Sequence, residues 1–174
     1  MAKSILIILF TCIMTIIQAQ NASTIYPLKE DISTIDGIMK ASYEVVSGEA
    51  GEIRQWERDL SLHHPKAIYS FIDTLDGKAY QAIMSLEDFH SETDTMVATT
   101  AFYESEIHRE VLVFGNIAHV WSTYETRLEK DGEVVRRGIN SIQLVYDQDR
   151  WWIISWIFDK EREHRKLPQT FLPN

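Results

Sequence analysis

Six polar side chains fall on one otherwise apolar face of a predicted sheet in the last third of the 174-residue chain. Each of them can donate or accept hydrogen bonds, and they are Arg109, Ser122, Tyr124, Ser141, Gln143 and Trp156. Burying such a group without a partner costs about 1 to 3 kcal/mol. The row therefore indicates that these groups satisfy one another, hold a buried water, or line a cavity that binds a ligand.

A ligand in such a cavity would be small and partly apolar. Trp56, on a preceding helix, and Trp156 would supply its apolar wall, although tryptophans at these spacings also pack in protein cores. The guanidinium of Arg109 would bind a carboxylate or a carbonyl oxygen of the ligand.

Two adjacent histidines are the candidates for acid–base chemistry. His63 and His64 precede Pro65 at the predicted end of a helix, from which one of them would reach the cavity. We take His64 as the candidate catalytic base, with His63 as the alternative, and Tyr124 or Arg109 as the group that stabilises negative charge. Because a histidine before proline also serves for capping or packing, binding without catalysis stays open.

Other chemistries are not favoured by the sequence. Adjacent histidines seldom bind one metal ion, and the H-x-H and H-E-x-x-H spacings are missing. Ser122 and Ser141 belong to no nucleophile motif. A net charge of −9, without a basic stretch interleaved with aromatic residues, argues against nucleic acid as a partner. We therefore expect no metal, no cofactor and no nucleic acid.

Four consecutive strands are expected to carry the polar row. They are rich in β-branched and aromatic residues and are separated by the turn-forming pairs Gly115-Asn116, Asp131-Gly132 and Gln148-Asp149. Their predicted bounds are Glu104–Phe114, Ile117–Lys130, Glu133–Tyr146 and Trp151–Asp159.

Hairpin-length turns predict the register of these strands. In the first hairpin, Arg109 lies opposite Ser122 and Ile107 opposite Tyr124. A two-residue turn at Asp131-Gly132 would then place Ser141 beside Ser122 and Gln143 beside Val120. The next hairpin would add Trp156 to the same face.

Helices are expected to cover that face. Apolar residues at helical spacing predict a helix from Thr34 to Ser47 and a second from about Ala50 that ends before Pro65. A hairpin around Asp76-Gly77 and a helix capped by Ser85 follow. This order predicts an α+β domain in which helices pack on one face of a curved, mainly antiparallel sheet.

The opposite face of the sheet also carries apolar residues, including Trp121 and Trp151. A contiguous apolar group of this kind suggests that a second surface covers it. We expect a homodimer that forms through this outer face.

The N-terminus has the pattern of a secretory signal. Ile5–Ile17 is apolar, and Ala19 offers a small residue for cleavage. We expect a signal peptide at 1–19, a flexible lead-in at 20–31, one domain at 32–160 and a tail at 161–174. The mature chain would be secreted or periplasmic and would have no membrane span. Since Cys12 lies within the signal, it would also have no disulfide or thiolate metal site.

The chain resembles the nuclear transport factor 2-like superfamily, and within it the SnoaL-like proteins, from about Ile35 to Asp159. The motifs that carry the resemblance are Trp56-Glu-Arg-Asp-Leu-Ser-Leu-His-His-Pro65, Phe114-Gly-Asn-Ile-Ala-His-Val-Trp-Ser-Thr-Tyr-Glu125, Arg137-Gly-Ile-Asn-Ser-Ile-Gln-Leu144 and Arg150-Trp-Trp-Ile-Ile154. The resemblance implies a cone-shaped pocket between the helices and the sheet, and dimerisation through the outer face.

The resemblance does not choose between enzymes and binding modules. A proton-transfer enzyme of the steroid-isomerase type would need a carboxylate on the concave face, whereas the expected register places Glu106, Glu110 and Glu125 on the outer face. We therefore expect a secreted or periplasmic small-molecule-binding protein. Two alternatives are a cofactor-independent lyase, isomerase or hydrolase, and a dimeric interaction module whose cone is filled by its own side chains.

Overall fold

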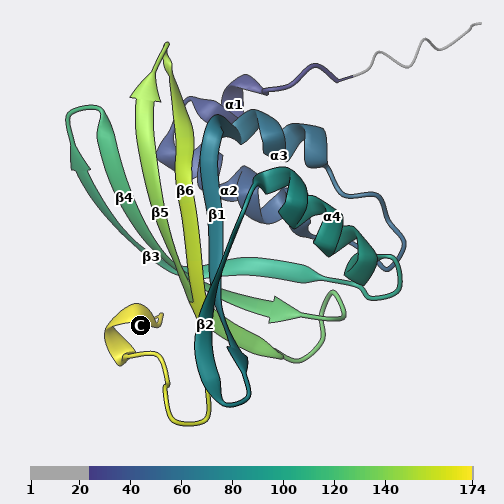
Figure 1. The fold of residues 1–174 in the computed structure, drawn as a ribbon. Coiled ribbons are helices and arrows are strands. Elements are labelled where there is room, and N and C mark those ends of the chain that lie inside the picture. Colours follow the sequence, from purple (N-terminus) through teal and green to yellow (C-terminus); the bar gives the residue numbers. More distant parts are fainter. Residues whose placement is uncertain (1–23, 174) are drawn as a thin grey trace, which may run out of the picture.

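The computed structural model describes residues 24–173, which form a six-stranded sheet with helices on one side (Figure 1). The strands lie in the order β2-β1-β6-β5-β4-β3. Their bounds are β1 His63–Leu75, β2 Lys78–Met84, β3 Tyr103–Phe114, β4 Ile117–Arg127, β5 Arg136–Asp147 and β6 Arg150–Lys160. Neighbouring strands are antiparallel except for β1 and β6, which run parallel. The expected signal peptide, residues 1–19, lies outside the described residues.

The α-helices of the described residues pack on the concave side of the sheet. They are α1 Lys29–Ile32, α2 Ile35–Val46, α3 Trp56–Leu62 and α4 Leu86–Val97, whereas a short 3-10 helix, η1, Gln169–Phe171, lies on the other side. Thr34, the expected start of the helix, is the N-cap of α2, and its hydroxyl accepts a hydrogen bond of 2.9 Å from the Gly37 N–H. Within residues 24–173, no helix is long and apolar enough to cross a membrane.

The hydrophobic core lies between helix α2 and the sheet. Helix α2 contributes Ile38, Met39 and Tyr43, all of which are buried. The sheet contributes Ala118, Val120, Tyr124, Ile142, Leu144, Ile153 and Trp156. This arrangement confirms the expected α+β cone.

The first hairpin pairs as expected near its tip but not at its base. Arg109 lies opposite Ser122. A β-bulge at Ile107 then interrupts the ladder, so that Glu106, not Ile107, pairs with Tyr124. The predicted position of Glu106 on the outer face is therefore wrong, because the extra residue turns every earlier side chain of β3 to the opposite side.

The predicted register of the second hairpin is wrong by one residue. Ser122 pairs with Asn140 and not with Ser141, and Gln143 is exposed and lies beside His119. The cause is the connection, because β4 ends at Arg127 and a loop of residues 128–135 replaces the expected two-residue turn. Since side chains alternate along a strand, one residue of slip exchanges the two faces of β5.

Part of the expected flexible lead-in is folded. Helix α1 contains Asp31, which is 3% exposed and receives two hydrogen bonds of 2.7 Å from the Arg58 guanidinium on α3. This buried ion pair attaches the start of the described chain to the helical layer.

The C-terminal segment, residues 161–173, crosses the outer face of the sheet (Figure 1). Its far end is held by Thr123, whose hydroxyl donates a 2.7 Å hydrogen bond to the Phe171 carbonyl. The Phe171 ring lies 5.9 Å from the Trp121 ring. The chain itself therefore covers part of the face through which we expect a dimer to form.

Candidate functional site

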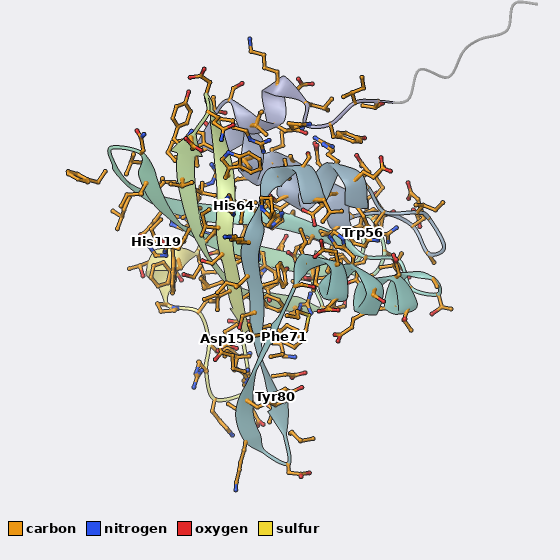
Figure 2. The ribbon with its side chains drawn as sticks, turned by 45° about the horizontal axis from the view of Figure 1, so that its top comes forward. Trp56, His64, Phe71, Tyr80, His119 and Asp159 are labelled. Carbon is orange, nitrogen blue, oxygen red and sulfur yellow. The ribbon has the colours of Figure 1, made fainter. Side chains whose placement is uncertain are left out.

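A cavity of about 240 Å³ opens between helix α4 and the concave face of the sheet. Six of its sixteen lining residues are aromatic, and these are Tyr69, Phe71, Phe89, Phe102, Tyr124 and Phe158. In Figure 2, Phe71 marks the part of β1 that borders it. The polar groups of its lining include Glu104, Arg136 and Asn140. The cavity thus combines an apolar body with a few polar contacts, as ligand sites generally do.

Glu104 is the most unusual group of this cavity. The β-bulge turns it inward, where its side chain is only 13% exposed. The Thr126 hydroxyl donates a 3.2 Å hydrogen bond to Oε2, and the Arg136 Nη2 lies 3.5 Å away, at the limit of hydrogen bonding. Burial raises the pKa of Glu104 to about 7, although Arg136 and Thr126 oppose the change. A carboxyl group of this kind is available as both acid and base near neutral pH.

Arg136 is held beside Glu104 by aromatic rings. Its guanidinium carbon lies 5.6 Å from the centre of the Phe102 ring and 5.7 Å from that of Tyr124. These are distances at which a cation is attracted to a ring face. Arg136 therefore presents a fixed positive charge to the cavity.

Two residues of the predicted polar row, Ser122 and Trp156, belong to a buried chain of hydrogen bonds with residues outside that row. The Trp156 Nε1 donates to Asn140 Oδ1 at 3.1 Å, and Asn140 Nδ2 donates to the Tyr43 hydroxyl at 2.9 Å. Tyr43 is 2.6 Å from the Ser122 hydroxyl, which donates to Glu106. Of the predicted ligand contacts, Ser122 and Trp156 are thus engaged with protein groups, while Tyr124 lines the cavity.

Arg109 lies away from this cavity and is paired twice. Its Nε contacts both carboxylate oxygens of Glu106, at 2.9 and 3.0 Å, and its Nη1 contacts Asp36 at 2.6 Å. Both carboxylates compete with any anionic ligand for this guanidinium.

Three other predicted contacts also lie outside the cavity. Ser141 is on the outer face, 3.0 Å from the His119 Nε2, and Figure 2 shows His119 on the side of the sheet opposite Trp56. Gln143 is exposed on that same outer face. Trp56 stacks on His90 at 4.2 Å and joins α3 to α4.

His63, and not His64, points into the cone. The His63 ring is 6% exposed, and its Nδ1 is 2.9 Å from the Asp59 carbonyl. Because a carbonyl only accepts, Nδ1 carries the hydrogen, and in the neutral ring Nε2 is an acceptor. This Nε2 is buried without a hydrogen-bond partner. His64 instead packs against Trp152, with its ring centre 6.0 Å away, and its Nδ1 accepts from the Lys66 N–H.

His63 and Glu104 meet at one small recess next to the main cavity. The recess has a volume of about 20 Å³ and is lined by both side chains together with Trp156. Val46, Tyr69 and Phe89 belong to its walls and also to those of the main cavity. The two spaces therefore adjoin, and the lining of the recess includes one histidine, His63, and two acidic residues, Glu104 and Asp59.

Metal binding is not supported by the described part of the chain. Within residues 24–173, no group of three histidine, cysteine, aspartate or glutamate side chains is placed to hold a metal ion.

Comparison with known proteins finds similar folds but no similar sequences. No family model and no curated protein matches the chain. A protein of unknown function with a cystatin-like fold from Nostoc punctiforme is 11% identical, with a TM-score of 0.53 over 72% of this chain and 90% of that chain. A "putative ketosteroid isomerase" from Parabacteroides distasonis is 15% identical, with a TM-score of 0.51 over 77% and 98%. A nuclear transport factor 2-like protein of unknown function from Silicibacter pomeroyi is 15% identical, with a TM-score of 0.49 over 72% and 92%.

The chain has an α+β cone fold that it shares with the Nostoc and Parabacteroides proteins. At these identities the likeness concerns the fold alone. The residues of this chain must therefore define the site.

Glu104 and Arg136 are the two charged cavity residues of the proposed site that the sequence analysis did not select. Glu104 opens the predicted strand, but its side depends on the bulge at Ile107, which no glycine marks. Arg136 belongs to β5, where the one-residue error in the predicted register exchanged the inner and outer faces. The sequence does show that Phe102, Glu104 and Glu106 alternate along the strand and therefore share one face. Only the bulge decides that this face is the inward one.

Proposed function

We propose that this protein binds a small, largely aromatic molecule in the cavity of its nuclear transport factor 2-like cone. The observation that carries the proposal is a buried carboxyl group, Glu104, in a cavity that six aromatic side chains line. A free cavity also favours ligand binding over an interaction module with a filled cone.

The chemistry of the lining suggests the polar part of the ligand. Glu104 in its protonated form donates a hydrogen bond, and the Arg136 guanidinium always donates. Two donors that converge on one region suit a carbonyl oxygen. The proposed ligand is therefore a small aromatic carbonyl compound, with Arg136 in the role that the sequence assigned to Arg109. The volume of about 240 Å³ is at the small end for ligand sites.

The proposal keeps the expected cell location and assembly. The chain would be secreted or periplasmic after cleavage near Ala19, since Ile5–Ile17 has signal-peptide character. A homodimer would use the outer-face residues that the C-terminal segment leaves free. Leu112 and Ile117 are exposed by 72% and 57% on neighbouring strands, and Phe114 at the hairpin tip is exposed by 83%.

Calorimetric titration with acetophenone, benzaldehyde, benzoate and benzylamine tests the proposal. We expect the two carbonyl compounds to bind the wild-type chain. The substitution Thr93→Trp, which fills the cavity from α4, should abolish that binding. Thr95→Trp is the matched control, because Thr95 is exposed on the same helix and does not line the cavity. Equal binding by the two variants would place the ligand elsewhere and refute the proposal.

A catalytic function is the second candidate, and one observation favours it. The unpartnered Nε2 of His63 lies in the wall of the recess that Glu104 also lines. In this scheme Nε2 removes a proton from the carbon next to a carbonyl, and protonated Glu104 donates a hydrogen bond to the enolate oxygen that forms. The likeness to the Parabacteroides protein is consistent with an isomerase but concerns only the fold.

Hydrogen exchange in D₂O distinguishes binding from catalysis. An enzyme of this kind would exchange the methyl protons of acetophenone for deuterium, as followed by NMR. His63→Gln would abolish exchange but retain binding, whereas His64→Gln would leave both unchanged. Binding without exchange by the wild-type chain would exclude this catalytic scheme and leave the binding function intact.

A further inference from the structure

The C-terminal segment, residues 161–173, stands off from the sheet and encloses a second hollow. This hollow has a volume of about 430 Å³. Its floor is the outer face of the sheet, with Trp121, Ile139 and Ile157 from three adjacent strands, and its cover includes Leu167 and Phe171. Figure 1 shows the segment on the side of the sheet opposite the helices. The hollow is therefore separate from the cone.

The segment is fastened at both ends of the hollow. Near β6, the Arg162 Nη2 donates to the Ile72 carbonyl at 3.2 Å, and the Leu167 N–H donates to Glu161 Oε1 at 3.0 Å. At the other end, Thr123 holds the Phe171 carbonyl. Because both ends are tied, the cover is positioned over the hollow without filling it.

The lining of the hollow carries a small excess of positive charge although the protein is acidic. Lys160, Arg165 and Lys166 line the hollow together with two carboxylates, Asp159 and Glu161, in a chain whose net charge is −9. Lys160 is paired with Asp73 at 3.1 Å, and Arg165 contacts Asp159 at 3.2 Å. Lys166 is 4.0 Å from Glu161 and is 68% exposed. Three cations and two carboxylates thus line the hollow, and Lys166 is the most loosely paired of these cations.

We propose that this hollow is a second binding site, for an amphipathic carboxylate. The apolar body of the ligand would lie between the floor and the cover, where it removes apolar surface from water. Its carboxylate would contact Arg165 and Lys166 at the rim, which supplies the charge complementarity. The site shares no ligand with the cone and does not depend on the proposed function.

Dodecanoate is a suitable probe, with dodecyltrimethylammonium as a cation of equal chain length, both below their micellar concentrations. We expect calorimetry to detect binding of dodecanoate only, and we expect the indole N–H resonance of Trp121 to shift in NMR spectra. The double variant Arg165→Glu/Lys166→Glu should bind dodecanoate at least about tenfold more weakly, since hydrogen bonds to charged groups are lost. Both residues are exposed, so the fold should tolerate the change.

Two further variants locate the binding. Lys66→Glu/Lys78→Glu makes the same change of net charge at exposed residues away from the hollow, and it should leave dodecanoate binding unchanged. Leu167→Trp, which fills the hollow, should abolish binding, whereas Thr93→Trp in the cone should not affect it. The inference is overturned by undetectable dodecanoate binding, by equal binding of the cation, or by a loss of binding with Thr93→Trp but not with the rim reversal.

Discussion

The Tyr43 hydroxyl on helix α2 and the Ser122 hydroxyl on strand β4 lie 2.6 Å apart inside the cone. This contact is the middle of a chain of hydrogen bonds from Trp156 through Asn140 to Glu106. The ends fix its direction, because an indole N–H only donates and a carboxylate only accepts. Tyr43 must therefore donate to Ser122. Burial is the main cause that raises the pKa of Tyr43 well above its ordinary value, so that the hydroxyl keeps its proton.

Removing the Tyr43 hydroxyl should destabilise the fold. In Tyr43→Phe, Asn140 loses an acceptor and Ser122 loses a donor in a buried setting, so we expect a loss of about 1 to 3 kcal/mol. Urea unfolding followed by tryptophan fluorescence measures it. Tyr80→Phe is the control, since Tyr80 is 45% exposed and should change stability little. Equal stabilities of the two variants would show that the chain of hydrogen bonds contributes nothing.

The stability of the protein should fall as the pH rises from about 4.5 to 7. The folded state raises the pKa of Glu104 from 4.5 to about 7, so the native state binds more protons than the unfolded state between these values. Above pH 7 the loss is complete and amounts to about 3 kcal/mol for this one group. Glu104→Gln removes this titrating group. The free energy of unfolding of the variant, relative to that of the wild type, should therefore increase across this interval. Urea unfolding at half-unit pH steps measures the difference, and two parallel profiles would contradict the prediction.

The buried pair of Asp31 and Arg58 should be much more important than the exposed pair of Lys40 and Glu44. Arg58→Met leaves the Asp31 carboxylate buried without its partner and should cost about 3 to 5 kcal/mol. Adding Asp31→Asn should recover part of that loss. Lys40→Met breaks a pair whose lysine is 73% exposed and should cost less than about 1 kcal/mol. Thermal unfolding ranks the three variants, and a cost of Arg58→Met no greater than that of Lys40→Met would refute the expectation.

Arg136 and Arg109 should contribute differently to ligand binding. Arg136→Met should weaken binding of an aromatic carbonyl compound by about tenfold, because it removes a charged donor from the cavity. Arg109→Met should leave the affinity unchanged, since its guanidinium is occupied by Glu106 and Asp36 away from the cavity. Calorimetry on both variants checks this. A larger loss of affinity with Arg109→Met than with Arg136→Met would instead indicate that the ligand binds at Arg109.

The sequence predicted the fold better than the site. Alternation and turn residues located the last four strands, β3 to β6, because these patterns follow from burying one face of a sheet. The loop of residues 128–135 could not be distinguished from a two-residue turn, and this difference placed Ser141 inward in the prediction and Asn140 inward in the structure. Choosing His63 over His64 required the exact end of α3, which helix signals locate only to within a few residues.

The bulge at Ile107 also has a consequence for how such a protein can evolve. This one extra residue determines which side chains of β3 before it face the cone and which face outward. Deleting the codon of Glu106 would move Ser105 and Tyr103 into the inward positions that Glu106 and Glu104 now occupy. A cone with these two inward carboxyl groups and one without them are therefore separated by one mutational event in an edge strand, with no change to the core between helix and sheet.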